Sequence, residues 1–224
     1  MKPYYQDKWV TIYHGDCREI LIADGYSAEY RLMTDPPYNV GKNYGVYKDN
    51  LSKQEYQSEI EWLTTKGKDA FNNQMVFILG SKNLLEWWRF IPDAKLVVVR
   101  MGATSDNHIK NLTLQFHPIL TTVPSNIKMP DLWEDIRWPG EGYFFNEERY
   151  GHPAMTPEKL AYRLVNLFSL PRSIIVDPYL GSGTFARVAK LANRFCIGIE
   201  IEEKYCEIAA KRCCQEVMEF RSVD

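Results

Sequence analysis

The stretch IIVDPYLGSGTFARVAKLANRFCIGIE, Ile174 to Glu200, has the pattern of a strand, a glycine-rich turn, a helix and a second strand. Its two apolar runs, one before Asp177 and one before Glu200, have the length of buried strands. Glycines at Gly181 and Gly183 allow a ligand to approach the backbone closely, and an acid about 20 residues further on can bind ribose hydroxyls. We therefore predict a βαβ unit that binds a nucleoside.

The same turn also satisfies the dinucleotide-binding pattern, as Gly181-x-Gly183-x-x-Ala186, so an NAD-binding oxidoreductase is a competing interpretation. Only a C-terminal helix is predicted after Glu200, whereas a dinucleotide fold needs another βαβ half to hold the nicotinamide. The order of the elements therefore argues against NAD. A glycine-rich turn that binds no ligand is the remaining alternative.

Composition and charge exclude several classes of protein. The 224 residues are 45% hydrophobic and 25% charged, which is ordinary for one globular domain. No apolar run is long enough for a membrane span and the N-terminus has no apolar signal region, so we expect a soluble, cytoplasmic protein. The five cysteines contain no C-x-x-C pair, which argues against a disulfide framework and a zinc site. We expect no metal site, because the four histidines lack ligand spacing: His14, His108, His117 and His152.

Apolar runs alternate with amphipathic stretches, which predicts an α/β fold with a mainly parallel sheet in one domain, residues 1–224. Strands are predicted at Val10–Tyr13, Tyr30–Thr34, Met75–Leu79, Leu96–Met101, Leu114–Thr122, Ser173–Val176 and Phe195–Ile199. Helices are predicted at Lys53–Ala70, Ser81–Phe90, Pro157–Phe168, Thr184–Leu191 and Glu203–Phe220. Two segments fit no regular element: a Gly-, Asn- and Tyr-rich loop at 39–50, predicted to be mobile, and a loop-rich stretch at 124–151, long enough to expect a function.

The stretch TDPPYNV, Thr34 to Val40, predicts a backbone of acceptors beside a carboxylate. Its two prolines remove two N–H donors and favour extended geometry. The Asp35 carboxylate and the Pro36 carbonyl would accept both protons of an NH2 group and aim the nitrogen lone pair of an aromatic amine at an electrophile. Tyr38 would stack on the ring of that amine. A strand-terminating Pro-Pro turn is the alternative interpretation.

The stretch GHPAMTPEKLAYRLV, Gly151 to Val165, predicts the start of a helix. Thr156 is expected to be the N-cap and Pro157 the first helical residue. The partial positive charge of this helix N-terminus could receive a ligand carboxylate.

Taken in chain order, the tetrad, the helix start and the glycine loop resemble the S-adenosylmethionine-dependent DNA methyltransferases that methylate amino groups, in the permuted arrangement called the beta group. The D-P-P-Y tetrad of that family matches Asp35 to Tyr38, and its H-P-x-x-x-P helix start matches His152 to Pro157. Its D-P-F-x-G-S-G-T loop matches Asp177 to Thr184, with Tyr179 in place of Phe. A G-D turn matches within YHGDCREIL, Tyr13 to Leu21. The similarity fades between about 51 and 148.

The resemblance implies a Rossmann-like methyltransferase fold, circularly permuted, with a seven-stranded mainly parallel sheet, helices on both faces and a target-recognition insertion at 124–151. It implies that strand Val10–Tyr13 lies beside the strand that ends at Glu200. The implied catalytic residues are Asp35, Pro36, Pro37 and Tyr38. The implied cofactor-binding residues are Asp16 and Cys17 at the adenine, Glu200 at the ribose, His152, Pro153 and Thr156 at the methionine end, and Asp35, Asp177, Tyr179, Gly181, Gly183 and Thr184 around the glycine loop.

The resemblance also bears on the substrate. Family members that methylate cytosine amino nitrogens commonly have Ser at the position of Asp35, so a flipped adenine in DNA, methylated at N6, is favoured. Cytosine N4 methylation, and methylation of RNA or protein by the same two acceptors, remain alternatives.

The charge pattern shows no extended basic surface for DNA. The net charge is −2, and acidic residues outnumber basic ones across 124–151. The candidate DNA contacts are Lys42, Tyr44, Tyr47 and Lys48 in the loop after the tetrad, and Trp133, Arg137 and Trp138 in the insertion. The short insertion is compatible with a brief recognition sequence, with a homodimer, or with a methyltransferase that has no partner restriction nuclease.

Overall fold

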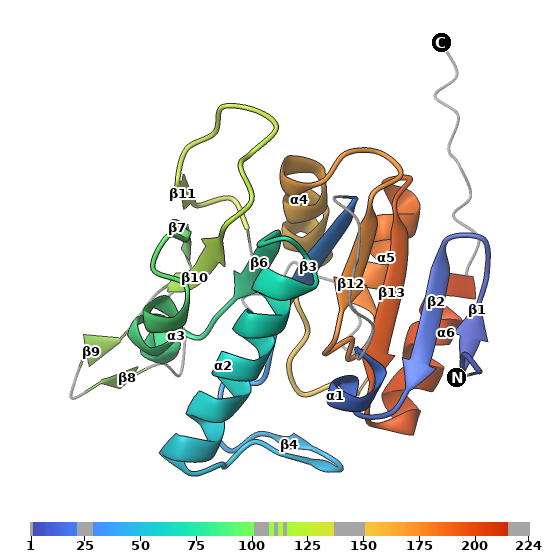
Figure 1. Cartoon of the computed structure of the whole chain (residues 1–224), viewed down its shortest axis with the longest axis horizontal. Coiled ribbons are helices and arrows are strands. Elements are labelled where there is room, and N and C mark those ends of the chain that lie inside the picture. The colour runs from blue at the N-terminus through green and yellow to red at the C-terminus, as the bar shows by residue number, and fades with distance from the viewer. Residues whose placement is uncertain are drawn as a thin grey trace.

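The computed structural model describes residues 2–21, 29–100, 108–109, 112–113, 116–136 and 151–214. Its centre is a nine-stranded sheet in the order β1-β2-β13-β12-β3-β6-β10-β7-β11 (Figure 1). The strands of this sheet are β1 (Tyr5–Gln6), β2 (Val10–His14), β3 (Tyr30–Thr34), β6 (Met75–Ile78), β7 (Lys95–Arg100), β10 (Phe116–Thr121), β11 (Leu132–Trp133), β12 (Ile174–Asp177) and β13 (Phe195–Glu200). The helices are α1 (Cys17–Ile20), α2 (Lys53–Asp69), the 3-10 turn η1 (Ser81–Asn83), α3 (Leu84–Phe90), α4 (Glu158–Phe168), α5 (Thr184–Leu191) and α6 (Glu203–Cys214).

The seven central strands are those predicted from the sequence, and the two edge strands are additions. β1 and β11 have two residues each, which is too short for an alternating apolar pattern to be recognised. Five neighbouring strands, β2, β13, β12, β3 and β6, are parallel, whereas β10 runs antiparallel to both β6 and β7. The mainly parallel sheet is therefore confirmed.

The permuted strand order is confirmed by the register of β2 and β13. These strands pair in parallel from Val10 opposite Cys196 to His14 opposite Glu200. A further hydrogen bond runs from the Gly15 N–H to the Glu200 carbonyl at 2.9 Å. The turn after β2 therefore begins at the same sheet edge where Glu200 ends β13.

Side chains alternate between the two faces of the sheet, and each face has its own core. Met33 and Ile175 pack in the cluster that includes Leu164 of α4, Val188 of α5 and Ala209 of α6. Their chain neighbours, such as Leu32 and Val176, pack in a second cluster with α2 and α3. Because residues that alternate along a strand point to opposite faces, helices cover both sides of the sheet, as predicted. Within the described ranges, no helix combines the length and apolar character needed to cross a bilayer.

Residues 39–50, which the sequence indicated to lack a regular element, contain a small hairpin of β4 (Asn43–Tyr44) and β5 (Tyr47–Lys48). Gly45 sits in its turn with φ of +84°, a conformation that few other residues adopt. The buried Asp49 carboxylate accepts hydrogen bonds from the backbone N–H groups of Asn39, Val40 and Lys42 at 2.7–3.1 Å. The prediction missed this hairpin because its strands are too short to show a period. The mobility of the segment stays a prediction.

β8 (His108–Ile109) pairs antiparallel with β9 (Leu112–Thr113) in a separate two-stranded sheet. Of the stretch at 124–151, residues 137–150 lie outside the described residues. The limits of a target-recognition insertion therefore stay a prediction.

Candidate active site

A pocket opens at the C-terminal ends of β3 and β12 and collects residues from all three predicted motifs. It is lined by Asp35, His152, Ala154, Met155, Thr156, Asp177, Tyr179, Leu180, Gly181, Ser182, Thr184 and Phe185. Seven of these were predicted from the sequence to bind the cofactor: Asp35, His152, Thr156, Asp177, Tyr179, Gly181 and Thr184. Pro153 is exposed and does not line the pocket. Ligand sites at strand carboxyl ends are the rule in open α/β sheets.

Both loop glycines have backbone conformations and surroundings that exclude a side chain. Gly181 has φ of +52°, and an added Cβ would come within 3.0 Å of His152 Nε2. Gly183 has φ of +81°, and an added Cβ would lie 2.6 Å from the Cβ and 2.9 Å from the Cα of Ala209 on α6. Gly181 therefore allows the His152 ring to pack against the loop, and Gly183 allows α6 to do so.

Glu200 and Asp177 are carboxylates buried at the ends of adjacent strands. Glu200 Oε2 accepts the Gly181 N–H at 2.7 Å and Oε1 accepts the Glu202 N–H at 2.8 Å, which fixes the plane of the carboxylate. Asp177 Oδ1 accepts the Thr34 hydroxyl at 2.6 Å, so the strand that carries the tetrad is joined to the strand that carries the glycine loop. Burial raises the pKa of Asp177 to about 7, and Asp35 and Glu200 add repulsion.

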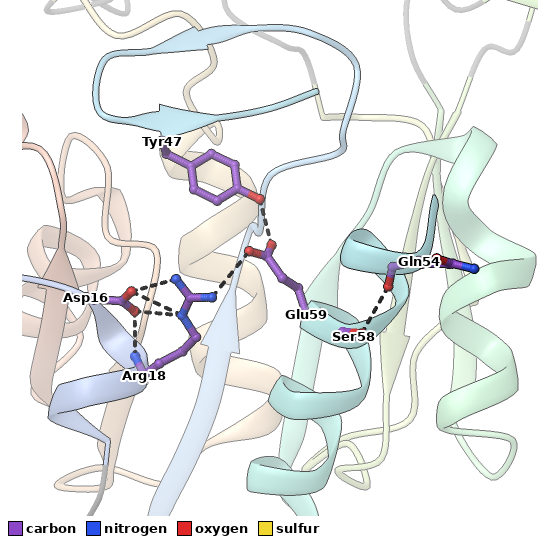
Figure 2. A network of polar contacts seen from close by, with 6 residues as sticks. All are labelled: Asp16, Arg18, Tyr47, Gln54, Ser58 and Glu59. Atoms are coloured by element: carbon purple, nitrogen blue, oxygen red, sulfur yellow. Dashed lines mark hydrogen bonds and ion pairs between the residues drawn. The ribbon is translucent and has the colours of Figure 1, made fainter. Parts of the chain in front are cut away.

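The turn after β2 brings Asp16 and Cys17 beside these strand ends. Asp16 caps α1 and pairs with Arg18 at 2.6 Å. Arg18 Nη1 also lies 3.9 Å from Glu59 of α2, which accepts the Tyr47 hydroxyl at 2.7 Å. Figure 2 shows this chain from Asp16 through Arg18 and Glu59 to the β4–β5 hairpin. Cys17 is buried, and burial raises the pKa of its thiol to about 12.

His152 lies above the glycine loop and contacts two other elements. Its ring is 4.4 Å from the ring of Tyr205 on α6 and 5.9 Å from the ring of Tyr44 on the hairpin. Burial lowers its pKa to about 4, so the imidazole is neutral near pH 7. Nδ1 accepts the Ala154 N–H at 3.3 Å, which places the proton on Nε2, the atom that faces Gly181.

Asp35 receives a hydroxyl on each carboxylate oxygen. Tyr38 Oη donates to Oδ1 at 2.5 Å, and Thr156 Oγ1 donates to Oδ2 at 2.6 Å. Burial raises the pKa of this carboxyl, and the two hydroxyls and Lys42 act in the opposite direction. Each oxygen has a second lone pair, so the carboxylate can still accept an amine N–H.

The tetrad backbone is held by three side chains that the sequence gave no reason to select. Asn83 donates to the Tyr38 carbonyl at 2.6 Å and to the Tyr56 hydroxyl at 2.8 Å. Tyr56 in turn donates to the Pro37 carbonyl at 3.3 Å and accepts from the Trp87 indole at 3.1 Å.

The Pro36 carbonyl remains available as an acceptor, since no hydrogen bond to it is found within the described part of the chain. The Asp35 carboxylate lines the pocket, whereas Pro36 is buried and does not line it, so the role of its carbonyl as the second acceptor stays a prediction. The ring of Tyr38 rests against Gly80, where an added Cβ would approach it to 3.0 Å.

The prediction that Thr156 caps the following helix is wrong. Helix α4 begins at Glu158, and the capping position is Pro157, which makes no side-chain cap. The Thr156 hydroxyl donates to the Asp35 carboxylate instead, and a hydrogen bond from a hydroxyl to a carboxylate is charge-assisted.

A buried arginine on α6 supports the glycine loop from behind. Arg212 Nη1 donates to the Ser182 carbonyl at 2.7 Å, to the Ser182 hydroxyl at 3.0 Å and to Thr184 Oγ1 at 3.2 Å. Its Nη2 lies 2.7 Å from Glu158 Oε1, in the first turn of α4. The loop and the α4 start are thus fixed to one cation. Thr184 and Glu158 lie 28 and 54 positions before Arg212 in the sequence, so no local motif predicts this contact.

The structure places the candidate DNA contacts in different surroundings, some exposed and some buried. Lys42, directly before β4, and Lys48, at the end of β5, are exposed. Tyr47 donates to Glu59. Trp133 is a correction: it is 3% exposed, packs in the core and donates to the Pro130 carbonyl at 3.0 Å, so it is not a stacking surface. Although Trp133 lies in a loop-rich segment, its large apolar ring is buried against apolar neighbours. Arg137 and Trp138 lie outside the described residues.

Comparison with known proteins places this geometry in a family. The type II methyltransferase M.HpaI of Haemophilus parainfluenzae is 28% identical over 221 residues, covering 86% of this chain and 70% of that protein. The M1.HpyAVI structure with SAM has a TM-score of 0.64 at 20% identity, covering 92% of this chain and all of that chain (100%). The cytosine-N4-specific PvuII DNA methyltransferase has a TM-score of 0.73 at 18% identity, covering 96% of this chain and 90% of that chain. These two structures confirm the predicted methyltransferase fold.

Residues 59–211 match the N6_N4_Mtase family, described as DNA methylase. That match spans more than half of the sequence and includes the helix start, the glycine loop and the acid at the end of β13. The chain therefore belongs to this family of DNA methylases.

Proposed function

We propose that this protein is a site-specific methyltransferase that transfers a methyl group from S-adenosylmethionine to N6 of an adenine turned out of DNA. The observation that carries the proposal is that Asp35, the carboxylate of the tetrad, lines the same pocket as Asp177 and Gly181 of the nucleoside-binding loop. A group held by the tetrad therefore lies next to a group held by the loop.

The residues present fit S-adenosylmethionine. The oriented, buried Glu200 carboxylate offers acceptors for ribose hydroxyls, and Gly181 lines the pocket where an added side chain would meet the His152 ring. Asp16 and Cys17 are proposed to face the adenine end, and His152 and the start of α4 the methionine end. When bound, this cofactor supplies an electrophilic methyl group on a positively charged sulfur.

The tetrad prepares the amine for attack. The Asp35 carboxylate and the Pro36 carbonyl accept its two N–H groups, so the nitrogen lone pair is directed into the pocket. As the new N–C bond forms, the bond between the methyl group and the cofactor sulfur would break with its electrons left on the sulfur, so the nitrogen gains positive charge and one proton must leave. The Asp35 carboxylate, already hydrogen-bonded to that nitrogen, is the acceptor at hand.

The choice of adenine depends on Asp35. Related enzymes that act on cytosine N4 commonly carry Ser at this position, and an aspartate favours the adenine amine. Cytosine N4 is the second candidate, because the cytosine-N4-specific PvuII enzyme shares the fold over 96% of this chain. We also propose that the segment at 124–151 recognises the target sequence.

The test is transfer of labelled methyl from S-adenosylmethionine to unmethylated plasmid DNA, with the product nucleoside identified. We expect N6-methyladenine, and a loss of at least about 100-fold in rate for Asp35→Ala and for the uncharged isostere Asp35→Asn. N4-methylcytosine would overturn the base assignment, and full activity of Asp35→Asn would overturn the role of the carboxylate. Label in RNA or protein but not in DNA would overturn the substrate.

A further inference from the structure

The Thr156 hydroxyl is buried in the pocket and is hydrogen-bonded to Asp35. Thr156 is 6% exposed and donates to Asp35 Oδ2 at 2.6 Å, across 121 positions of sequence. The other donor to this carboxylate, Tyr38, lies three residues after Asp35 in the same loop. Thr156 therefore supplies the one observed contact that ties the carboxylate to a different element of the described structure.

The element that carries Thr156 is itself firmly held. Pro157 follows with φ of −58°, and its carbonyl accepts the Ala161 N–H at 3.0 Å as α4 begins. Glu158 is bound to the buried Arg212 and to Arg187. A threonine has few side-chain rotamers, so a fixed backbone also fixes the direction of its hydroxyl.

We infer that Thr156 is a positioning residue for methyl transfer, which holds the Asp35 carboxylate in the orientation and charge state that accept the target amine. The inference rests on the proposed function. A carboxylate with one oxygen bound by a fixed donor cannot rotate, so its remaining lone pairs keep one direction. A hydroxyl donor also favours the ionised form, which carries no proton of its own and acts only as an acceptor.

Several charged or titratable groups act on Asp35 together with Thr156. They are Tyr38 in its own loop, Lys42 and Tyr44 on the hairpin segment and Asp177 at the end of β12, and the neutral His152 lines the same pocket. Burial raises the pKa of Asp35, and Thr156 is the first of the groups that oppose this rise. Removing the hydroxyl should therefore raise the pH at which the carboxylate loses its charge.

The test compares Thr156→Val, which removes the hydroxyl at nearly the same shape, with Thr156→Ser, which keeps it. The rate of methyl transfer is measured against pH at saturating cofactor and DNA. For Thr156→Val we expect the midpoint of the acidic limb to move up by about one pH unit or more, and for Thr156→Ser to stay at the wild-type value. An unchanged midpoint in Thr156→Val, or an equal shift in both variants, would overturn the inference.

A second readout separates this inference from the proposed function. The Asp35 carboxyl carbon is titrated by NMR in the protein without substrate, with its signal assigned from Asp35→Asn. An upward shift of the titration in Thr156→Val but not in Thr156→Ser supports the contact even if DNA is not the substrate. Identical titrations in all three proteins would overturn it, whereas a failed DNA assay alone would overturn only the proposed function.

Discussion

Three acids meet at the C-terminal ends of neighbouring strands: Asp35 after β3, Asp177 on β12 and Glu200 on β13. Burial raises the pKa of each, and Asp177 feels repulsion from both of the others. In the protein without ligand, burying these three acids together lowers the free energy of unfolding. A positively charged ligand offsets that cost when it binds, so the same feature that weakens the fold favours the cofactor.

Asp177 should make stability fall as pH rises. Its pKa is about 7 in the folded state and about 3.9 in the unfolded chain, so between these values the folded protein binds a proton that the unfolded chain has lost. For Asp177→Asn, the gain in unfolding free energy over wild type should grow from about pH 4 to 7, to on the order of a few kcal/mol. Denaturant unfolding without cofactor, from pH 4 to 8, measures the difference.

The matched control is Asp69→Asn, which removes an exposed carboxylate at the end of α2. Its stability should run parallel to that of wild type across this pH range. If the Asp177→Asn curve is also parallel, Asp177 is not the buried acid that the structure describes.

Whether a residue of the site could be predicted depends on how far its partners lie from it in the sequence. Asp35, Gly181 and Glu200 could be predicted because each belongs to a short motif whose local spacing carries the chemistry. The partner of Thr156 could not be predicted, since its contact with Asp35 exists only after β3 and the start of α4 are folded together. The same holds for Arg212 behind the glycine loop.

The β4–β5 hairpin links the tetrad to the cofactor side of the molecule. Besides the Tyr47 contact with Glu59, the Val46 N–H donates to Glu202 Oε2 at 3.0 Å, just after Glu200. Lys42, directly before β4, and Lys48, at the end of β5, are exposed and are our proposed phosphate contacts. In residues 124–136, by contrast, which are the described part of the candidate insertion, one lysine, Lys128, stands against three acids.

Replacing both hairpin lysines, Lys42→Ala with Lys48→Ala, should weaken DNA binding and flatten its salt dependence. Each lost phosphate contact lowers the slope of log affinity against log salt by about 0.9, so the pair should lower it by about 2. Fluorescence anisotropy with labelled duplex at several salt concentrations measures both effects. Lys2→Ala with Lys8→Ala removes the same charge at the β1 edge and should change neither, and an unaltered slope in the hairpin variant would rule the contacts out.

Elements were predictable in proportion to their length. The 17-residue α2 begins at Lys53, where the sequence placed it, because a full Ser52–Glu55 capping box marks its start. The two-residue strands could not be predicted, because they are formed by pairing with a neighbour and not by a pattern of their own.

The molecule as a whole should be stabilised by the cofactor product and not by a dinucleotide. S-adenosylhomocysteine at about 100 times its dissociation constant adds about 2.7 kcal/mol. For a domain of this size that should raise the Tm by roughly 5 to 10 °C. Thermal unfolding followed with and without each ligand measures this. A rise with NAD and none with S-adenosylhomocysteine would restore the oxidoreductase interpretation.

The pairing of β2 with β13 has a consequence for how the protein is made. Val10 can complete its parallel ladder only after Cys196 has left the ribosome, which at typical synthesis rates takes roughly 10 to 40 s. During that interval β2 has an open edge that can pair with other chains, and only the two residues of β1 cover its opposite side. Expression of this protein should therefore depend on chaperones that bind nascent chains early, even though every residue of the Asp35–Tyr38 tetrad is synthesised within the first forty.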